Sequence, residues 1–210
     1  MFNTKTNMNR SINPMKKNAL TLILTVIAGG AATATEPVNE VKTEVSTDKS
    51  TVTWKAYKVT GSHHGTVALQ SGSLVFDNGQ LSGGEFVVDM TTLTATDLEG
   101  EWKDKLVGHL KSEDFFSVEK HQTSKLVFTE VKQTGKNSYE VTGNLTIKGI
   151  TKPVTFDMSV YGSKATATMK VDRAQYDIRY GSGSFFDNLG DKTIYDEFDM
   201  VVDLEWEPAS

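Results

Sequence analysis

Apolar and polar residues alternate along most of this chain, and residues 143–160, GNLTIKGITKPVTFDMSV, show the alternation most clearly. Successive side chains of a β-strand point to opposite faces of the sheet, so a period of two marks a strand with one dry face. Two such strands around the Gly-x-x-x-Pro connection form a predicted hairpin whose dry face either fills a core or encloses an apolar guest. The residues of that face are Leu145, Ile147, Val154, Phe156, Met158 and Val160.

The same alternation recurs through the rest of the chain beyond residue 50. About eight such strands, joined mostly by short turns of Gly, Asn, Asp and Ser, predict an antiparallel sheet that is closed into a barrel or folded into a sandwich. The further apolar rows are Val52 and Trp54; Leu74 and Phe76; Phe86, Val88 and Met90; Leu126 and Phe128; Tyr139 and Val141; Ala165, Ala167, Met169 and Val171; and Phe198, Met200, Val202, Leu204 and Trp206.

One segment has the period of a helix instead. In TDLEGEWKDKLVGHLKSEDFF (96–116), the apolar residues Leu98, Trp102, Leu106 and Leu110 recur at a spacing of four. Thr96 and Glu99 match a capping box, and Glu101 and Lys105 form an i,i+4 pair. The sequence therefore predicts one helix that lies over an open end of the barrel.

The N-terminal residues have the form of a secretory signal peptide. Met15-Lys16-Lys17 precedes the uncharged run ALTLILTVIA (19–28), and Ala32-Thr33-Ala34 follows as an A-x-A cleavage site. The alternative, a membrane anchor, needs about 20 apolar residues. We expect residues 1–34 to be removed, with residues 1–14 as an extension upstream of a second start at Met15, and the mature protein to be periplasmic or secreted.

The charge and cysteine content of the mature chain exclude several classes of partner and cofactor. Residues 1–34 hold four of the 22 basic residues and no acidic ones, which leaves 18 basic against 27 acidic residues and a net charge near −9. Such a surface repels nucleic acid and anionic bilayers. The chain has no Cys, which excludes disulfides and thiolate ligands. Residues 35–48 are polar and without a period, and we expect a flexible tether before a domain at 49–207.

Two long motifs carry a resemblance to a known family. HLKSEDFFSVEKHQTSKLVFTEV (109–131) and GNLTIKGITKPVTFDMSV (143–160) resemble the two most recognisable segments of the bacterial YceI-like family. VDRAQYDIRYGSG (171–183) is similar to a late segment of that family, and His63-His64-Gly65-Thr66 to an early one. The resemblance extends over roughly residues 50 to 206.

The resemblance implies an all-β fold, an eight-stranded antiparallel lipocalin-like barrel with one covering α-helix. It also implies that a long isoprenoid, of the polyprenol or quinone-precursor type, is held in an elongated internal pocket, with no other cofactor. Eight strands is about the size at which a barrel either fills itself with side chains or encloses one ligand. Transient membrane contact for lipid exchange is expected, and the oligomeric state is left open, a homodimer included.

The residues favour a lipid pocket without identifying its wall. Met and Phe side chains adapt to an irregular aliphatic guest, but they also build ordinary cores. Trp102, Leu106 and Leu110 are the candidates on the predicted helix. The candidates on the strands are Trp54, Phe76, Phe86, Met90, Phe128, Leu145, Phe156, Met158, Met169, Phe198 and Met200.

Catalytic and metal chemistry find little support in the sequence. His63 and His64 are neighbours, so in a strand they point to opposite faces, and no His-Glu-x-x-His spacing exists. Gly181-Ser182-Gly183-Ser184 does not match a nucleophile elbow. We expect neither a metal site nor a catalytic residue. The alternatives to a lipid carrier are a packed barrel that serves as an interaction or stress-related module, and an enzyme acting on such a lipid.

Overall fold

The computed structural model describes residues 40–208, which form nine strands and one α-helix. The predicted signal peptide, 1–34, and residues 35–39 of the predicted tether lie outside the described residues. The elements are β1 (Glu40–Glu44), β2 (Thr51–Lys58), β3 (Gly61–Asp77), β4 (Gln80–Ala95), α1 (Gly100–Lys111), β5 (Thr123–Gln133), β6 (Ser138–Ile147), β7 (Ile150–Tyr161), β8 (Lys164–Asp172) and β9 (Ile194–Glu205), with short 3₁₀ turns at Arg173–Tyr176 and Gly190–Lys192.

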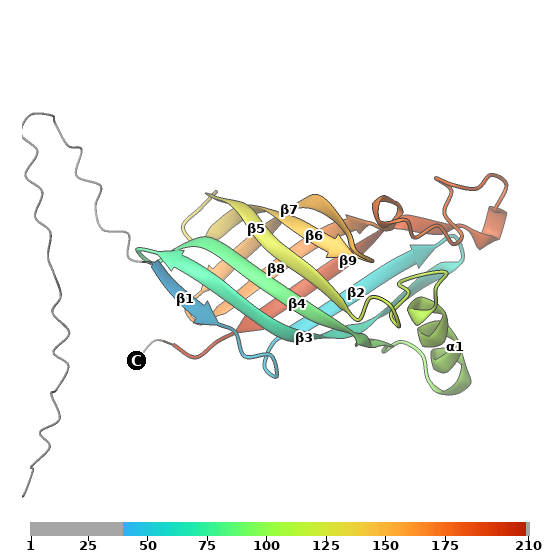
Figure 1. The fold of residues 1–210 in the computed structure, drawn as a ribbon, viewed down its shortest axis with the longest axis horizontal. Helices are drawn as coiled ribbons and strands as arrows, with labels where there is room; N and C mark the ends of the chain where they lie inside the picture. Colours follow the sequence, from blue (N-terminus) through green and yellow to red (C-terminus); the bar gives the residue numbers. More distant parts are fainter. Residues whose placement is uncertain (1–39, 209–210) are drawn as a thin grey trace, which may run out of the picture. The chain divides into compact units, whose positions relative to one another are not determined.

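Strands β2 to β9 close into an antiparallel barrel (Figure 1). Each strand pairs with the next in the order β3-β2-β9-β8-β7-β6-β5-β4, and β4 pairs back onto β3. Closure leaves no long free edge among these eight strands. It also directs one face of every strand, and therefore one alternate row of side chains, toward the barrel axis. The prediction of an eight-stranded all-β barrel with one covering helix is confirmed.

Strand β1 lies where a flexible tether was predicted. It pairs with the second half of β3, from Glu40 opposite Asp77 to Glu44 opposite Ser73, and Val45 behind it is buried. The tether prediction is therefore wrong for these residues. The strand is held by backbone hydrogen bonds to β3, while its own Val41 is 46% exposed among charged neighbours, so no apolar row marks it.

The hairpin predicted from residues 143–160 is formed by β6 and β7. The two strands are in continuous register from Ser138 opposite Ser159 to Ile147 opposite Ile150. Lys148 and Gly149 join them with φ of 51° and 74°, the left-handed values that a tight two-residue hairpin turn requires.

A bulge in β3 explains why its alternation was only half visible in the sequence. Val67, Leu69 and Leu74 are all buried, although the last two are five positions apart. The register with β4 shifts between Leu69 and Ser71, which moves the inward row from odd to even positions.

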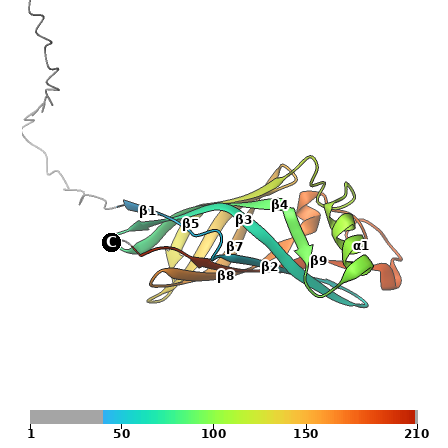
Figure 2. The same ribbon diagram turned by 90° about the horizontal axis from the view of Figure 1, so that it is seen from below.

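The two ends of the barrel differ. Figures 1 and 2 show α1 and the segment 173–193 together at one end, which we call the helix end; β1 and the β3–β4 and β7–β8 turns lie at the other, the far end. The interior holds two apolar clusters, one toward each end. Any opening into the interior beside α1 is therefore set by the loops of the helix end.

Helix α1 begins later than its predicted cap. Its N-cap is Glu99, with no side-chain capping bond, while the Thr96 amide donates to the His64 carbonyl at 2.9 Å and so extends the pairing of β4. The capping-box prediction is wrong because Thr96 is engaged by the barrel. The pair of Glu101 and Lys105 is present at 2.6 Å. Within residues 40–208, no helix is long and apolar enough to cross a membrane.

Candidate functional site

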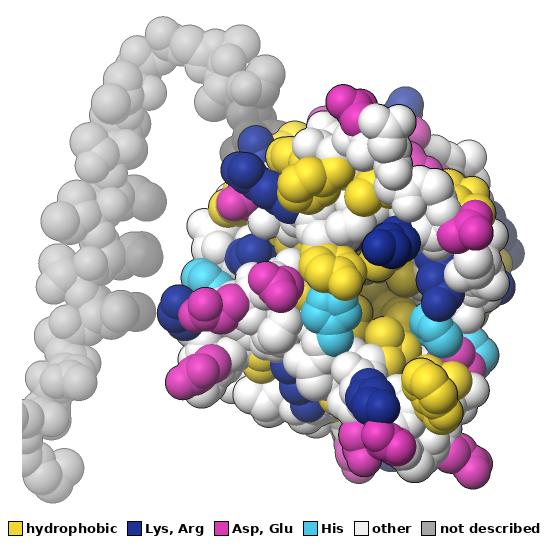
Figure 3. Space-filling view, turned by 90° about the vertical axis from the view of Figure 1, so that its right-hand side faces the viewer, with side chains coloured by type: hydrophobic (Ala, Val, Ile, Leu, Met, Phe, Trp, Pro, Cys, Tyr) yellow, Lys and Arg dark blue, Asp and Glu magenta, His cyan; other side chains and the backbone are white. Residues whose placement is uncertain are grey.

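The barrel encloses an apolar cavity of about 160 Å³. All eight barrel strands contribute inward side chains to its wall, and α1 and the loop after it contribute Leu110, Phe115 and Phe116. Figure 3 looks onto the helix end and shows a hollow with an apolar floor, with His and basic side chains near its edge. The cavity is thus reached from the end that carries α1.

Most of the predicted pocket residues lie on this wall, because the strand periodicity correctly gives the inward row. That they contact a ligand stays a prediction. The candidates on the wall are Trp54, Phe86, Met90, Leu110, Phe128, Leu145, Phe156, Met158, Met169, Phe198 and Met200.

Three candidates lie elsewhere. Phe76 packs at the far end against Trp206, with ring centroids 5.9 Å apart. Trp102 is 71% exposed, and Leu106 packs against the helix-end cluster without reaching the cavity. Of the three helix candidates only Leu110, in the last turn of α1, lines the cavity. A helical spacing of four gives a common face but does not tell how far along the helix that face touches the barrel.

The sequence interpretation missed Phe115 and Phe116. Both lie in the loop between α1 and β5, their rings are 5.4 Å apart, and both line the cavity at its helix end. The signal was the adjacent pair of aromatic residues in SEDFF, which falls after the helical period stops and before the strand period begins.

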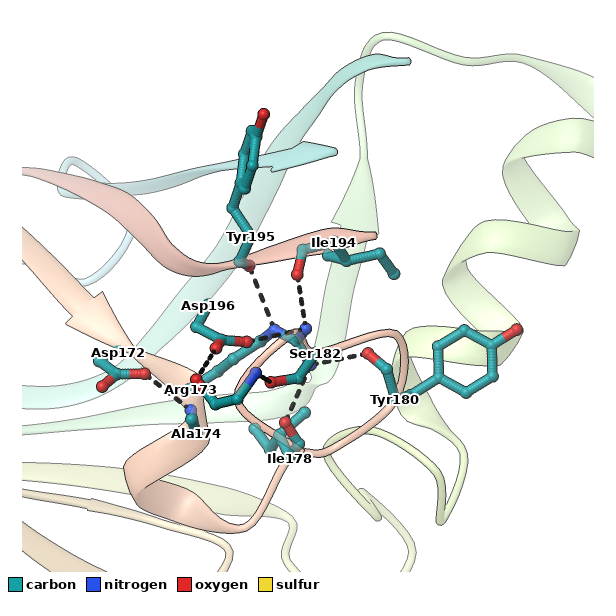
Figure 4. A network of polar contacts seen from close by, with 10 residues as sticks. Asp172, Arg173, Ala174, Ile178, Tyr180, Ser182, Ile194, Tyr195 and Asp196 are labelled. Atoms are coloured by element: carbon teal, nitrogen blue, oxygen red, sulfur yellow. Dashed lines mark hydrogen bonds and ion pairs between the residues drawn. The ribbon is translucent and has the colours of Figure 1, made fainter. Parts of the chain in front are cut away.

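Arg173, also missed, is a buried cation on the wall, only 2% exposed (Figure 4). Its Nη1 donates to the carbonyls of Ile178 and Tyr180, both at 2.9 Å, and its Nη2 donates to that of Ile194 at 3.0 Å. Its Nε donates to the carbonyl of Tyr195 at 3.3 Å. All three guanidinium nitrogens are therefore engaged by backbone carbonyls, Nη1 by the segment between β8 and β9, and Nη2 and Nε by the first two residues of β9.

An ion pair completes this cluster. Asp196 Oδ1 lies 3.1 Å from Nη2 of Arg173 without hydrogen-bond geometry, and Asp196 Oδ2 accepts from the Ser184 hydroxyl at 2.6 Å. Burial lowers the pKa of Arg173, and the charges of Asp196 and Asp172 oppose that shift. Because its donors are used, Arg173 fixes the shape of the loop at the mouth of the cavity and offers little to a ligand head group.

Two contacts tie α1 to the barrel rim. Nδ1 of His63 is hydrogen-bonded to Asp97 Oδ2 at 2.8 Å, at the junction between β4 and α1. On the other side, the His109 ring of α1 meets the Tyr180 ring edge-on, with centroids 4.3 Å apart. The helix is therefore attached to both β3 and the β8–β9 segment.

The wall offers few groups for chemistry. Trp54 offers the cavity no free hydrogen-bond donor, because its indole Nε1 donates to the Thr94 carbonyl at 3.1 Å. Lys125 directs its ammonium to Glu85, at 2.6 Å, where both side chains are half exposed. Ser124, in the inward row of β5, is a hydroxyl on an otherwise hydrocarbon surface. Within residues 40–208, no cluster of three or more His, Asp or Glu side chains could hold a metal.

A closed antiparallel barrel around an apolar cavity, with a helix at its mouth, defines a lipocalin-like class of protein. Within that class, the chain belongs to the YceI-like domain family, which matches residues 43–206.

Relatives and solved structures agree with this membership. A UPF0312 protein of Pseudomonas putida is 34% identical over 145 residues, which are 69% of this chain and 71% of that protein. The crystal structure of BcnA from Burkholderia cenocepacia superposes with a TM-score of 0.60 at 20% identity, covering 76% of this chain and 98% of the other. A polyisoprenoid-binding domain from Saccharophagus degradans, implicated in plant cell wall breakdown, gives 0.51 at 12% identity over 79% and 98%. At these identities the two structures show the shared fold.

Proposed function

We propose that this chain is an exported lipid-binding protein that holds a long isoprenoid, of the polyprenol or quinone-precursor type, inside its barrel and carries or stores it. The observation that supports this most is the wall of the cavity, which is mainly hydrocarbon and whose buried cation, Arg173, is already engaged by backbone carbonyls. The same wall supports a binding role rather than catalysis. The solved domain from Saccharophagus degradans is described as polyisoprenoid-binding.

Energetics favour a carrier over a permanent store. Removing a five-carbon isoprene unit from water gains about 3 to 4 kcal/mol. In a bilayer the unit is already dry, so the preference for the barrel is a small difference that depends on packing. Exchange with a bilayer is then reversible, as a carrier requires.

The volume of the cavity bears on the ligand. A cavity of about 150 Å³ takes up one benzene-sized guest, and the cavity here is about 160 Å³. A chain of several isoprene units therefore needs wall side chains to change rotamer. Met90, Met158, Met169 and Met200 are unbranched and suit that adjustment.

The same small volume is the observation that favours the second candidate, a packed barrel that serves as an interaction or stress-related module. Ala167 and Ala165, two positions apart on the inward row of β8, distinguish the two candidates. Both are buried in the far-end cluster, but only Ala167 also lines the cavity.

The first test is mass spectrometry of organic extracts from the purified, folded protein, where we expect an isoprenoid. In Ala167→Leu the added carbons should enter the cavity, so isoprenoid retention falls while stability is kept or rises. Ala165→Leu, the matched control, should cost about 1 to 3 kcal/mol by overpacking and keep the lipid. Extracts without isoprenoid, together with an equal loss of stability in both variants, would establish the packed module instead.

A further inference from the structure

Aromatic side chains are exposed mainly at the helix end. Of the nine large apolar side chains that are exposed in the described part of the chain, six lie there: Val59, Trp102, Tyr180, Phe185, Phe186 and Tyr195. Their exposed fractions run from 39% to 71%. Soluble proteins seldom expose large apolar groups together unless the surface binds something. We call this set the aromatic rim.

The rim surrounds the mouth of the cavity. Val59 in the β2–β3 turn donates its amide to the Thr193 carbonyl at 3.1 Å, which joins that turn to the β8–β9 segment. Tyr180 in the same segment meets His109 of α1, and Tyr195 itself lines the cavity. The β2–β3 turn, α1 and the β8–β9 segment thus bring exposed apolar side chains to the helix end, and Figure 3 shows apolar side chains around the hollow on that face.

Two cations beside rim residues are paired locally. Lys105 lies over the Trp102 ring at 5.2 Å and pairs with Glu101 at 2.6 Å. Arg179 lies over the Phe185 ring at 5.0 Å and pairs with Asp177 at 2.6 Å. Trp102 and Phe185 therefore each lie beside a cation that is paired with a carboxylate.

We propose that the aromatic rim is the surface with which this protein docks on a lipid bilayer, with the mouth of the cavity facing the membrane. This proposal rests on the proposed function, because docking would let the isoprenoid pass between bilayer and barrel without entering water. Transfer through water would cost about 3 to 4 kcal/mol of free energy for each exposed isoprene unit. Amphipathic aromatic rings settle at the interface between head groups and acyl chains. The paired charges beside Trp102 and Phe185 and the acidic mature chain favour zwitterionic rather than anionic head groups.

Flotation with phosphatidylcholine vesicles tests the rim. The mature chain should float with these vesicles, and replacing part of the phosphatidylcholine by phosphatidylglycerol should not strengthen binding. The double variant Phe185→Ser/Phe186→Ser should reduce vesicle binding by about tenfold or more, because two rings no longer enter the interface. Tyr161→Ser is the matched control, since Tyr161 is an aromatic side chain 59% exposed at the far end, and it should bind like wild type.

Other outcomes would contradict the proposal. Equal binding of all variants, or binding to anionic vesicles alone, would exclude an aromatic docking surface. A rim variant that changes the sedimentation coefficient but not vesicle binding would make the rim an interface between copies of the chain. The isoprenoid content of the protein, measured without vesicles, separates this test from that of the proposed function: a lipid-loaded wild type that never floats would refute the rim alone.

Discussion

Phe156 shows at the scale of one residue how wall and core differ. It lies mid-strand in β7, is 5% exposed, and its ring is 5.7 Å from that of Phe128. It also borders the cavity, so part of its ring lacks neighbours. Leu74 is equally deep in the barrel, with no exposed surface, but lies off the cavity wall. The exposed fraction of the side chain alone therefore does not distinguish a cavity-wall residue from a core residue.

We predict that Phe156→Ala destabilises the lipid-free protein less than Leu74→Ala does, although it removes more atoms. The cost of a large-to-small change includes a cavity term, and that term is smaller where a cavity already exists. Leu74→Ala should cost about 2 to 5 kcal/mol and Phe156→Ala less than about 3 kcal/mol. Urea titrations of both variants, stripped of lipid, give the comparison.

Reloading the same proteins with isoprenoid extends the test. A ligand that binds only the folded state adds stability, so wild type and Leu74→Ala should gain, and Phe156→Ala should gain less. If Phe156→Ala instead shows a full core-sized loss and no protein responds to isoprenoid, Phe156 is packing only.

The sequence could predict which residues point inward but not which of them border empty space. Met158 and Tyr139 stand opposite each other in the β6–β7 hairpin and both are buried, yet only Met158 lines the cavity. That difference depends on how the eight rows meet across the barrel axis. Arg173 was missed for a related reason, since a lone Arg has no local pattern and its carbonyl partners lie five to 22 positions along the chain.

At the scale of elements, local rules gave the right structure where neighbours in sequence are also neighbours in space. The β6–β7 hairpin is of this kind, and its turn and register follow from residues 143–160. The start of α1 and the existence of β1 depend instead on β3, which is distant in sequence. A period read along one segment cannot reveal such a partner.

Asp97 stabilises the junction between β4 and α1, and its ionisation makes the stability of this junction depend on pH. Its Oδ2 is bonded to His63, and its Oδ1 accepts the His64 amide at 3.2 Å. Burial acts to raise the pKa of Asp97, but the hydrogen bonds from His63, from the His64 amide and from its own amide outweigh it, so the pKa is lowered. The stability that Asp97 contributes is therefore fully present above its unfolded-state pKa of about 4. It is lost as the pH falls through the lower pKa that Asp97 has in the folded protein.

We predict that Asp97→Asn is less stable than wild type by about 1 kcal/mol above about pH 5, because two hydrogen bonds to a charged acceptor are weakened. The gap should shrink as the pH falls below about 4, when Asp97 itself becomes neutral. Urea titrations of the pair at several pH values measure it. Asp104→Asn, on the exposed side of α1, is the control and should show no comparable gap. A gap that widens toward acid would contradict the role of Asp97.

At the scale of the whole molecule, the described domain begins only a few residues after the predicted cleavage site. Strand β1 starts at Glu40, so a chain that begins at Thr35 would keep every strand of the barrel and the pairing of β1 with β3. Removing residues 1–34 would also take away four basic residues and leave an acidic protein. Export would then place a complete barrel, with its aromatic rim, in the compartment that faces a membrane surface.

We predict that the exported protein begins at Thr35, because the small residues Ala32 and Ala34 form the A-x-A site after a basic start and a short apolar run. Intact mass of the protein from the exported fraction measures this directly. Ala34→Leu should block cleavage and leave the precursor with the membrane, since a branched side chain does not suit a small-residue position. Thr33→Leu, at the tolerant middle position, is the matched control and should be processed like wild type. A wild-type species that keeps residues 15–34 and stays in the membrane fraction would make this segment an anchor, and the barrel would then exchange its lipid while tethered to the bilayer.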